Sequence, residues 1–183
     1  LESMCLKEQD PRLDSELARR QESAKGDCSA GTTWFETHRN FFKTKGLTWQ
    51  GVKLPQTLQE NPWFQLLPSR EKQALSYALQ HAGSITSVDI SQRIDRLSYG
   101  RDSVLPTIIP HNRTWLVQQE RLLTGFEALG LQGFPMDILT SSDHCPSDPQ
   151  LMDLAGNAFS GPVITAVLVC VFAGLGDLAD RVQ

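Results

Sequence analysis

The stretch Arg121-Leu-Leu-Thr124-Gly-Phe-Glu127-Ala-Leu-Gly-Leu131-Gln132-Gly133-Phe134-Pro135 carries the clearest structural signal in the 183-residue sequence. Thr124 and Glu127 have the spacing of a capping box, in which the hydroxyl accepts from an amide of the first turn and the carboxylate accepts from the amide of the cap. A helix is therefore predicted to start at Thr124. Gly133 and Pro135 are expected to end it after about two turns, because glycine favours a helix end and proline has no amide donor.

Similar signals place further elements on either side of this stretch. The segment after Ser69 has apolar residues at helical spacing and predicts an amphipathic helix that ends at Gly83. Asp148-Pro149 predicts the start of a helix that passes through Leu151–Ala155 and breaks at Gly156-Asn157. Short strands are expected at Ile85–Ile90, Pro106–Ile109 and Thr114–Val117, with residues 91–103 as a basic loop. Short strands and helices together predict an α+β fold.

The length predicts about one domain with an additional tail. Residues 1–31 are rich in charge and are interpreted as a linker or flexible arm, with at most a short helix over Leu13–Ser23. Residues 32–160 are expected to form the small domain. Aromatic residues are dense in its first part, where core packing is favoured over a nucleic-acid stacking surface; they are Trp34, Phe35, Phe41, Phe42, Trp49, Trp63 and Phe64.

The final segment, 161–183, begins with an apolar run of about 15 residues up to Leu175, whereas a bilayer span needs about 20. A helix that is apolar on every side has to be buried, and the small domain has too little surface to bury one completely. We therefore expect this helix to belong to a core whose other half lies outside this sequence. A membrane anchor is the alternative that the run leaves open.

Charge is distributed unevenly along the chain. Residues 90–124 contain five arginines and three acidic residues, whereas residues 125–183 contain seven acidic residues and one arginine. A polyanion is expected to meet the middle segment, although so small an excess also arises by chance. The four cysteines form no CxxC pair, so neither a zinc site nor a disulfide framework is indicated, and an intracellular location is expected.

Catalytic motifs are scarce. Asp143, His144 and Cys145 are adjacent in sequence, but a catalytic triad is assembled by the fold, and neighbouring side chains point in different directions. The sequence contains no GxxxxGK[ST] phosphate loop, and no GxGxxG follows a predicted strand. An enzyme that is complete within this chain is therefore not indicated.

The quoted stretch resembles the ninth motif of cytosine-5 DNA methyltransferases, which reads Arg, two residues, Ser or Thr, two residues, Glu, and then Leu-Gln-Gly-Phe-Pro. Gly156-Asn157-Ala158-Phe159-Ser160 resembles the tenth motif of the same family, usually Gly-Asn-Ala/Ser-Val-Pro, and it leads into a helix as in the family. Pro106-Thr107-Ile108 matches a segment that the family places just before the ninth motif. The resemblance covers roughly residues 88–175.

The resemblance implies roles for several residues. Gly156, Asn157 and Ala158 would line the pocket for S-adenosylmethionine, and the last helix would pack on a large Rossmann-like sheet. The ninth-motif residues Arg121, Thr124, Glu127, Gln132 and Gly133 would hold the small target-recognition domain together. DNA would be the partner, and its phosphates or bases would be contacted by arginines of the middle segment, Arg93, Arg96, Arg101 and Arg113.

Other parts of the family pattern are absent from the sequence. The family's nucleophile is the Cys of Pro-Cys-Gln, which attacks a flipped cytosine with help from the Glu of Glu-Asn-Val, and neither tripeptide occurs here. The chain alone is therefore expected to be inactive, with the catalytic half upstream in the same protein. In a eukaryote the location would be nuclear. The alternative is a non-catalytic methyltransferase-like module that binds DNA or protein, because Phe159-Ser160 replaces Val-Pro in the tenth motif.

Overall fold

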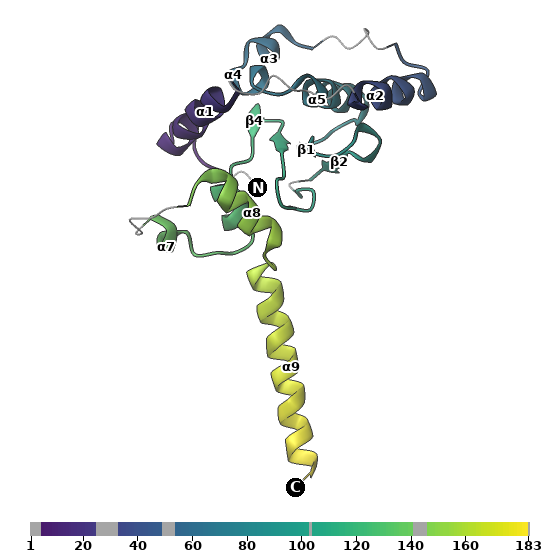
Figure 1. Ribbon diagram of the computed structural model, residues 1–183. Helices are drawn as coiled ribbons and strands as arrows, with labels where there is room; N and C mark the ends of the chain where they lie inside the picture. The colour runs from purple at the N-terminus through teal and green to yellow at the C-terminus, as the bar shows by residue number, and fades with distance from the viewer. Residues whose placement is uncertain (1–4, 25–32, 49–53, 103, 141–145, 183) are drawn as a thin grey trace.

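The structure is a computed structural model that describes residues 5–24, 33–48, 54–102, 104–140 and 146–182. It has an α+β fold in which short helices surround a small sheet (Figure 1). The first helices are α1 (Pro11–Ala24), α2 (Thr33–Thr44), α3 (Gln56–Glu60), α4 (Pro62–Gln65) and α5 (Ser69–His81). The later helices are η2 (Ile94–Arg96), α6 (Gly125–Leu131), α7 (Met136–Thr140), α8 (Asp148–Asn157) and α9 (Gly161–Val182).

Four antiparallel strands form the sheet in the order β2-β1-β3-β4. They are β1 (Ser87–Asp89), β2 (Ser98–Gly100), β3 (Thr114–Leu116) and β4 (Arg121–Leu122). Val88 lies opposite both Tyr99 and Trp115, and Trp115 lies opposite Leu122. Because side chains alternate across a strand, this row of residues occupies one face of the sheet.

The two faces of the sheet are covered by different helices. Trp115, which is 1% exposed, packs with residues of α1, α3, α4 and α5 in one hydrophobic cluster. Its neighbour Leu116 points the other way and packs with residues of α6 and α8 in a second cluster. The sheet therefore separates an upper group of helices from a lower group (Figure 1).

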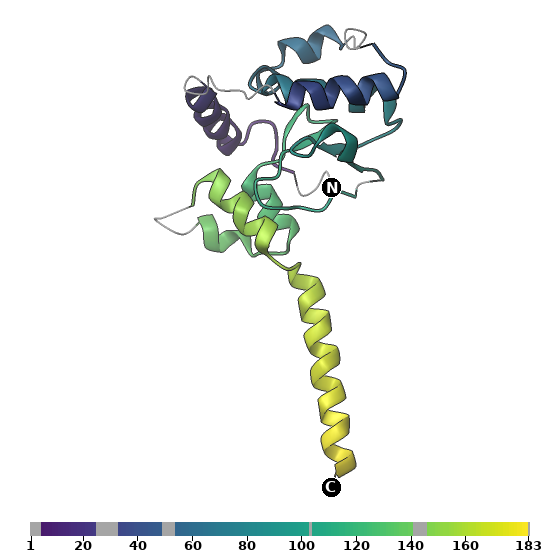
Figure 2. The same ribbon diagram turned by 45° about the vertical axis from the view of Figure 1, so that its right-hand side comes forward.

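Helix α9 leaves the domain and extends away from it in both ribbon views (Figures 1 and 2). Its described side chains are largely exposed although they are apolar, with Phe172 at 66% and Val169 at 61%. By length and composition alone, the stretch Asp148–Ala173 is apolar enough to cross a membrane. The helix therefore presents an apolar surface that no other described part of this chain covers.

Several predicted elements are confirmed. Helix α5 starts at Ser69, and Gly83 follows its end with a φ of +72°, a conformation that favours glycine. Helix α6 has the predicted capping box and a length of 7 residues. Helix α8 is present, but its N-cap is Ser147 and not Asp148, because the side-chain oxygen of Gln150 accepts from the Ser147 amide.

Two expectations around the sheet are wrong. Residues Pro106–Ile109 form no strand, since the chain here has proline at 106 and 110 and lies beside α8 instead of joining the sheet. The expected loop 91–103 contains η2 and β2, where Ile94 is 2% exposed and Tyr99 packs on the first cluster. Residues 98–100 form a strand because Ser98 and Gly100 pair with β1. Such pairing between strands has no local sequence signal.

Aromatic residues of the first half mostly pack inside the domain. Phe42, Trp63 and Phe64 are buried, whereas Phe35 is 44% exposed. The favoured expectation of core packing therefore holds for these three, while Trp49 lies outside the described residues. Helix α1 also contributes to the core, because Leu13 is buried in the first cluster. The division of the chain at residues 31 and 160 stays a prediction.

Candidate functional site

Arg121, Thr124 and Glu127 form a buried polar network at the end of β4. Arg121 and Glu127 make a double ion pair, with Nη2 2.6 Å from Oε1 and Nη1 2.9 Å from Oε2, and both side chains are at most 5% exposed. The Thr124 amide and hydroxyl each donate to Oε2 of Glu127 at 2.9 Å. In return, the Glu127 amide donates to Oγ1 of Thr124 at 3.2 Å.

The N-terminal segment completes this network. The Leu6 amide donates to Oε1 of Glu127 at 2.7 Å, and Arg121 donates to the Leu6 carbonyl at 3.3 Å. Burial alone would raise the pKa of Glu127, but the Arg121 hydrogen bond and charge, with the amides of Thr124 and Leu6, outweigh it and lower that pKa. Glu127 is therefore a fixed carboxylate with a structural role and not an acid or base open to a substrate.

The stretch that resembles the ninth motif is hydrogen-bonded to the two residues that flank Gly156–Ser160. The carbonyl of Gln132 accepts from the Gly161 amide at 2.7 Å, and its side-chain Nε2 donates to the Ala155 carbonyl at 3.3 Å. Gly133 has a φ of +85°, and a Cβ there would overlap Pro162. Gln132 and Gly133 therefore hold the junction between α8 and α9.

Gly156, Asn157 and Ala158 lie at this junction. A Cβ on Gly156 would overlap the backbone of Ile109 and Pro110, so glycine is required here for close packing. Asn157 is exposed, and its Nδ2 donates to the Asp153 carbonyl at 2.9 Å. Asp153 in turn accepts from the His111 amide at 3.0 Å, which fixes the loop before β3 against α8.

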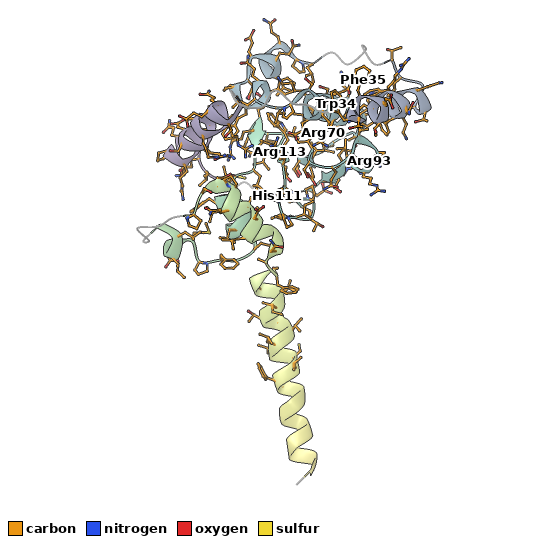
Figure 3. The ribbon with its side chains drawn as sticks, viewed as in Figure 1. Trp34, Phe35, Arg70, Arg93, His111 and Arg113 are labelled. Carbon is orange, nitrogen blue, oxygen red and sulfur yellow. The ribbon has the colours of Figure 1, made fainter. Side chains whose placement is uncertain are left out.

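The four predicted DNA-contacting arginines do not form one group. Arg93 is 60% exposed and pairs with Asp95, Arg96 is exposed, and Arg101 donates to the Ala82 carbonyl at 2.9 Å. Among these four, only Arg113 lines a large cavity that the described residues form. Figure 3 shows Arg93 at the edge of the molecule.

This cavity, of about 620 Å³, lies between α1, α2, α4, α5 and the start of β3. No acidic side chain lines it. Four arginines do, namely Arg19, Arg20, Arg70 and Arg113. Trp34 and Trp63 contribute aromatic walls. The sequence analysis missed Arg19, Arg20 and Arg70, since only the fold brings α1 and α5 next to Arg113.

A second group of charges joins α1 to the start of α8. Asp148 hydrogen-bonds with Glu16, accepts from the Gly125 amide at 2.6 Å and lies 3.8 Å from Nη2 of Arg20. Burial, followed by the charge of Glu16, raises the pKa of Asp148 to about 6. Glu16 itself keeps a lowered pKa, because hydrogen bonds and charges from Arg19 and Arg20 outweigh the effect of its burial.

Two other kinds of site are a catalytic group and a metal centre. The Asp143-His144-Cys145 run lies outside the described residues. In the described part of the chain, no group of three or more His, Cys, Asp or Glu side chains is placed to hold a metal ion. The candidate sites described here are the junction at residues 156–158 and the arginine cavity.

Fold and site together define a small α+β domain in which a buried Arg–Glu–Thr network supports a junction helix.

No protein-family model matches the chain. Over 84 residues, or 46% of the chain, it is 31% identical to a protein of Verticillium dahliae named DNA (cytosine-5-)-methyltransferase DMT5. Over 83 residues, or 44% of the chain, it is 34% identical to the protein of that name from Cryptococcus neoformans var. grubii. The chain spans about 3% of the length of these curated relatives. These similarities support the resemblance of the chain to the cytosine-5 DNA methyltransferase family.

The buried network predicts a large effect of Glu127→Gln. The substitution leaves Arg121 charged and buried without its carboxylate, so the free energy of unfolding should fall by about 3–5 kcal/mol in urea denaturation at pH 7. The matched control Glu36→Gln, at an exposed position of α2, should change it by less than about 0.5 kcal/mol. Equal effects of the two substitutions would mean that the ion pair does not stabilise the fold.

The raised pKa of Asp148 predicts a pH effect of defined sign. Its protonated form is favoured in the folded state, so its contribution to stability is complete below about pH 4 and is lost as the pH rises through about 6. Asp148→Asn keeps an acceptor for the Gly125 amide and removes the charge beside Glu16. The variant should therefore be more stable than the parent by about 1–2 kcal/mol at pH 7.5, with no gain at pH 4. Exposed Asp14→Asn is the control, and a gain for Asp148→Asn that does not vary with pH would contradict the assignment.

Proposed function

We propose that this chain is the C-terminal portion of an S-adenosylmethionine-dependent DNA (cytosine-5) methyltransferase, in which it contributes DNA recognition and part of the cofactor pocket. The catalytic cysteine would come from an upstream half of the same protein, because Pro-Cys-Gln is absent from this sequence. The chain alone would then be inactive. The protein would act inside the cell, and in the nucleus in a eukaryote.

The proposal rests on the hydrogen bonds between the first motif-like stretch and the two residues that flank the second. Gln132 hydrogen-bonds to Ala155 and Gly161, so the Leu-Gln-Gly turn fixes the position of the Gly156-Asn157 turn. Such a link would keep the recognition domain and the cofactor pocket at a fixed position relative to each other. The two fungal proteins that match nearly half of the chain are named cytosine-5 methyltransferases, in agreement with this proposal.

The residues at the junction are compatible with one wall of a cofactor pocket. Asn157 is exposed and uses Nδ2 for Asp153, which leaves its Oδ1 as an acceptor. Ala158 is small and partly exposed, and Gly156 lets the backbone approach the 109–110 loop. When bound, S-adenosylmethionine supplies an activated methyl group. The residues of this chain would orient the cofactor and exclude water, and they would take no proton in the reaction.

The exposed apolar surface of α9 supports the existence of the upstream half. It includes seven apolar side chains that are each at least 38% exposed, namely Val163, Ile164, Val167, Leu168, Val169, Val171 and Phe172. Burying such a surface against another domain is favourable by about 25 cal/mol per Å². A cofactor-binding sheet in the upstream half is the covering surface that we propose.

The cofactor assignment is tested by Asn157→Ala in the intact protein that contains this chain. Tritiated methyl transfer to duplex DNA should show a KM for S-adenosylmethionine raised by about tenfold, from the loss of one hydrogen bond of about 1 kcal/mol and of local order. The DNA Kd should be unchanged. Asn40→Ala, at an exposed site on α2, is the matched control. No cofactor binding by the intact parent would favour the non-catalytic module instead.

DNA recognition is tested by the double variant Arg96→Gln/Arg101→Gln in the same intact protein. If both side chains contact phosphate, duplex affinity should fall and the slope of log affinity against log salt should decrease by about 1.8. Arg39→Gln/Lys43→Gln on α2 removes the same charge and serves as the control. A slope that is unchanged in the Arg96/Arg101 variant would show that the DNA surface lies elsewhere.

A further inference from the structure

We propose that the 620 Å³ cavity between α1, α2, α5 and β3 binds one nucleotide of single-stranded DNA, with its phosphate at Arg70 and Arg113 and its base against Trp34. The choice of DNA as the source of the nucleotide rests on the proposed function. The cavity itself is a separate site from the junction at residues 156–158. Figure 3 labels three of its residues, Trp34, Arg70 and Arg113, which all line this one cavity.

The charge of the cavity favours an anion. Its four lining arginines are backed by two buried glutamates, Glu16 at 4% and Glu71 at 5% side-chain exposure. Glu16 pairs with the two arginines of α1, and Glu71 pairs with Arg70 and Arg113. Asp148, 3.8 Å from Arg20, is a third carboxylate beside the four arginines. One net positive charge therefore remains in a recess where water screens it less than on an open surface.

The two arginines that would hold the phosphate differ in how they are fixed. Arg70 donates to the carbonyls of Ser91 and Gln92 at 3.2 Å and to Glu71 at 3.1 Å, so its guanidinium is held from behind. Arg113 uses Nη1 for Glu71 at 2.9 Å and is 41% exposed. Among the described residues its Nε and Nη2 have no hydrogen-bond partner. These two donors form the edge of a guanidinium that suits bidentate binding of a phosphate.

The size and walls of the cavity favour a nucleotide over a bare anion or an acidic peptide. A volume of about 620 Å³ is within the range of pockets that hold small organic ligands. Trp34 is half-buried, and it stands edge-on to His38 at 5.2 Å between ring centroids, which limits its movement. A base stacked on such a ring gains affinity whatever its sequence. Bases inside a duplex are already stacked on one another, so the unpaired strand is the form that fits.

Binding of fluorescein-labelled hexathymidylate to the full 183-residue chain, followed by fluorescence anisotropy at several salt concentrations, tests this proposal. Arg113→Gln should weaken binding by about fivefold and reduce the salt slope by about 0.7, the value for one phosphate of a single strand. Glu71 keeps Arg70 as a partner in this variant, and circular dichroism checks the fold. Arg39→Gln, with the same charge change outside the cavity, should leave both quantities unchanged.

The aromatic wall is tested with a pair of variants at residue 34. Trp34→Ala should weaken hexathymidylate binding by about tenfold, whereas Trp34→Phe, which keeps a ring for stacking, should stay within about twofold of the parent. This pair keeps the proposal testable if Arg113→Gln does not fold.

Competition distinguishes the other occupants. Hexaglutamate or inorganic phosphate should displace the probe only at concentrations at least about tenfold above those of unlabelled hexathymidylate. Equal displacement by hexaglutamate would mean a site for acidic peptides, and equal displacement by phosphate would mean a simple anion site. Either result, or equal affinities of Arg113→Gln and Arg39→Gln, would overturn the proposal. If the intact parent protein does not methylate duplex DNA although the variants change oligonucleotide binding as expected, the proposed function is wrong and the nucleotide site is still supported.

Discussion

The buried ion pair of Arg121 and Glu127 joins the elements that position the candidate cofactor residues. Removing two charges from water is costly, and the cost is recovered only when each charge is paired and its remaining hydrogen-bonding positions are filled. Here the Thr124 amide and hydroxyl and the Leu6 amide fill those positions on Glu127. The pair therefore ties three parts of the chain to one point: the last strand, the start of α6 and the N-terminal segment.

Contacts of α6, which starts at this ion pair, determine the position of the candidate cofactor residues. Gly125 begins α6, and a Cβ there would overlap the backbone of Asp148 and Met152, so α6 and α8 pack unusually closely. Gln132, at the other end of α6, hydrogen-bonds to Ala155 and Gly161 and sets the angle at which α9 departs. Each contact depends on a residue of the Thr-x-x-Glu or Leu-Gln-Gly pattern. The pattern therefore encodes the geometry of the Gly156-Asn157 junction more directly than it encodes any chemistry.

Elements that neighbouring residues determine could be predicted from the sequence, whereas elements and sites that depend on long-range contacts could not. The capping box of Thr124 and Glu127 and the helix after Ser69 were predicted correctly, because neighbouring residues determine them. The strand Ser98–Gly100 was missed and a strand at Pro106–Ile109 was wrongly expected, because pairing partners decide strands. The arginine cavity was also missed, since Arg19, Arg70 and Arg113 are brought together only by packing of α1 and α5. The contacts of Leu6 with Glu127 span 121 residues and have no sequence signal.

We propose that the end of α8 forms part of the S-adenosylmethionine pocket in a larger methyltransferase. Photo-labelling of the intact protein with S-adenosylmethionine carrying a tritiated methyl group tests it most directly, because the label marks the residues beside the bound cofactor. We expect label in the peptide spanning residues 151–160, and we expect S-adenosylhomocysteine to prevent this labelling. Competed labelling confined to other peptides of the protein, with none in 151–160, would contradict the account.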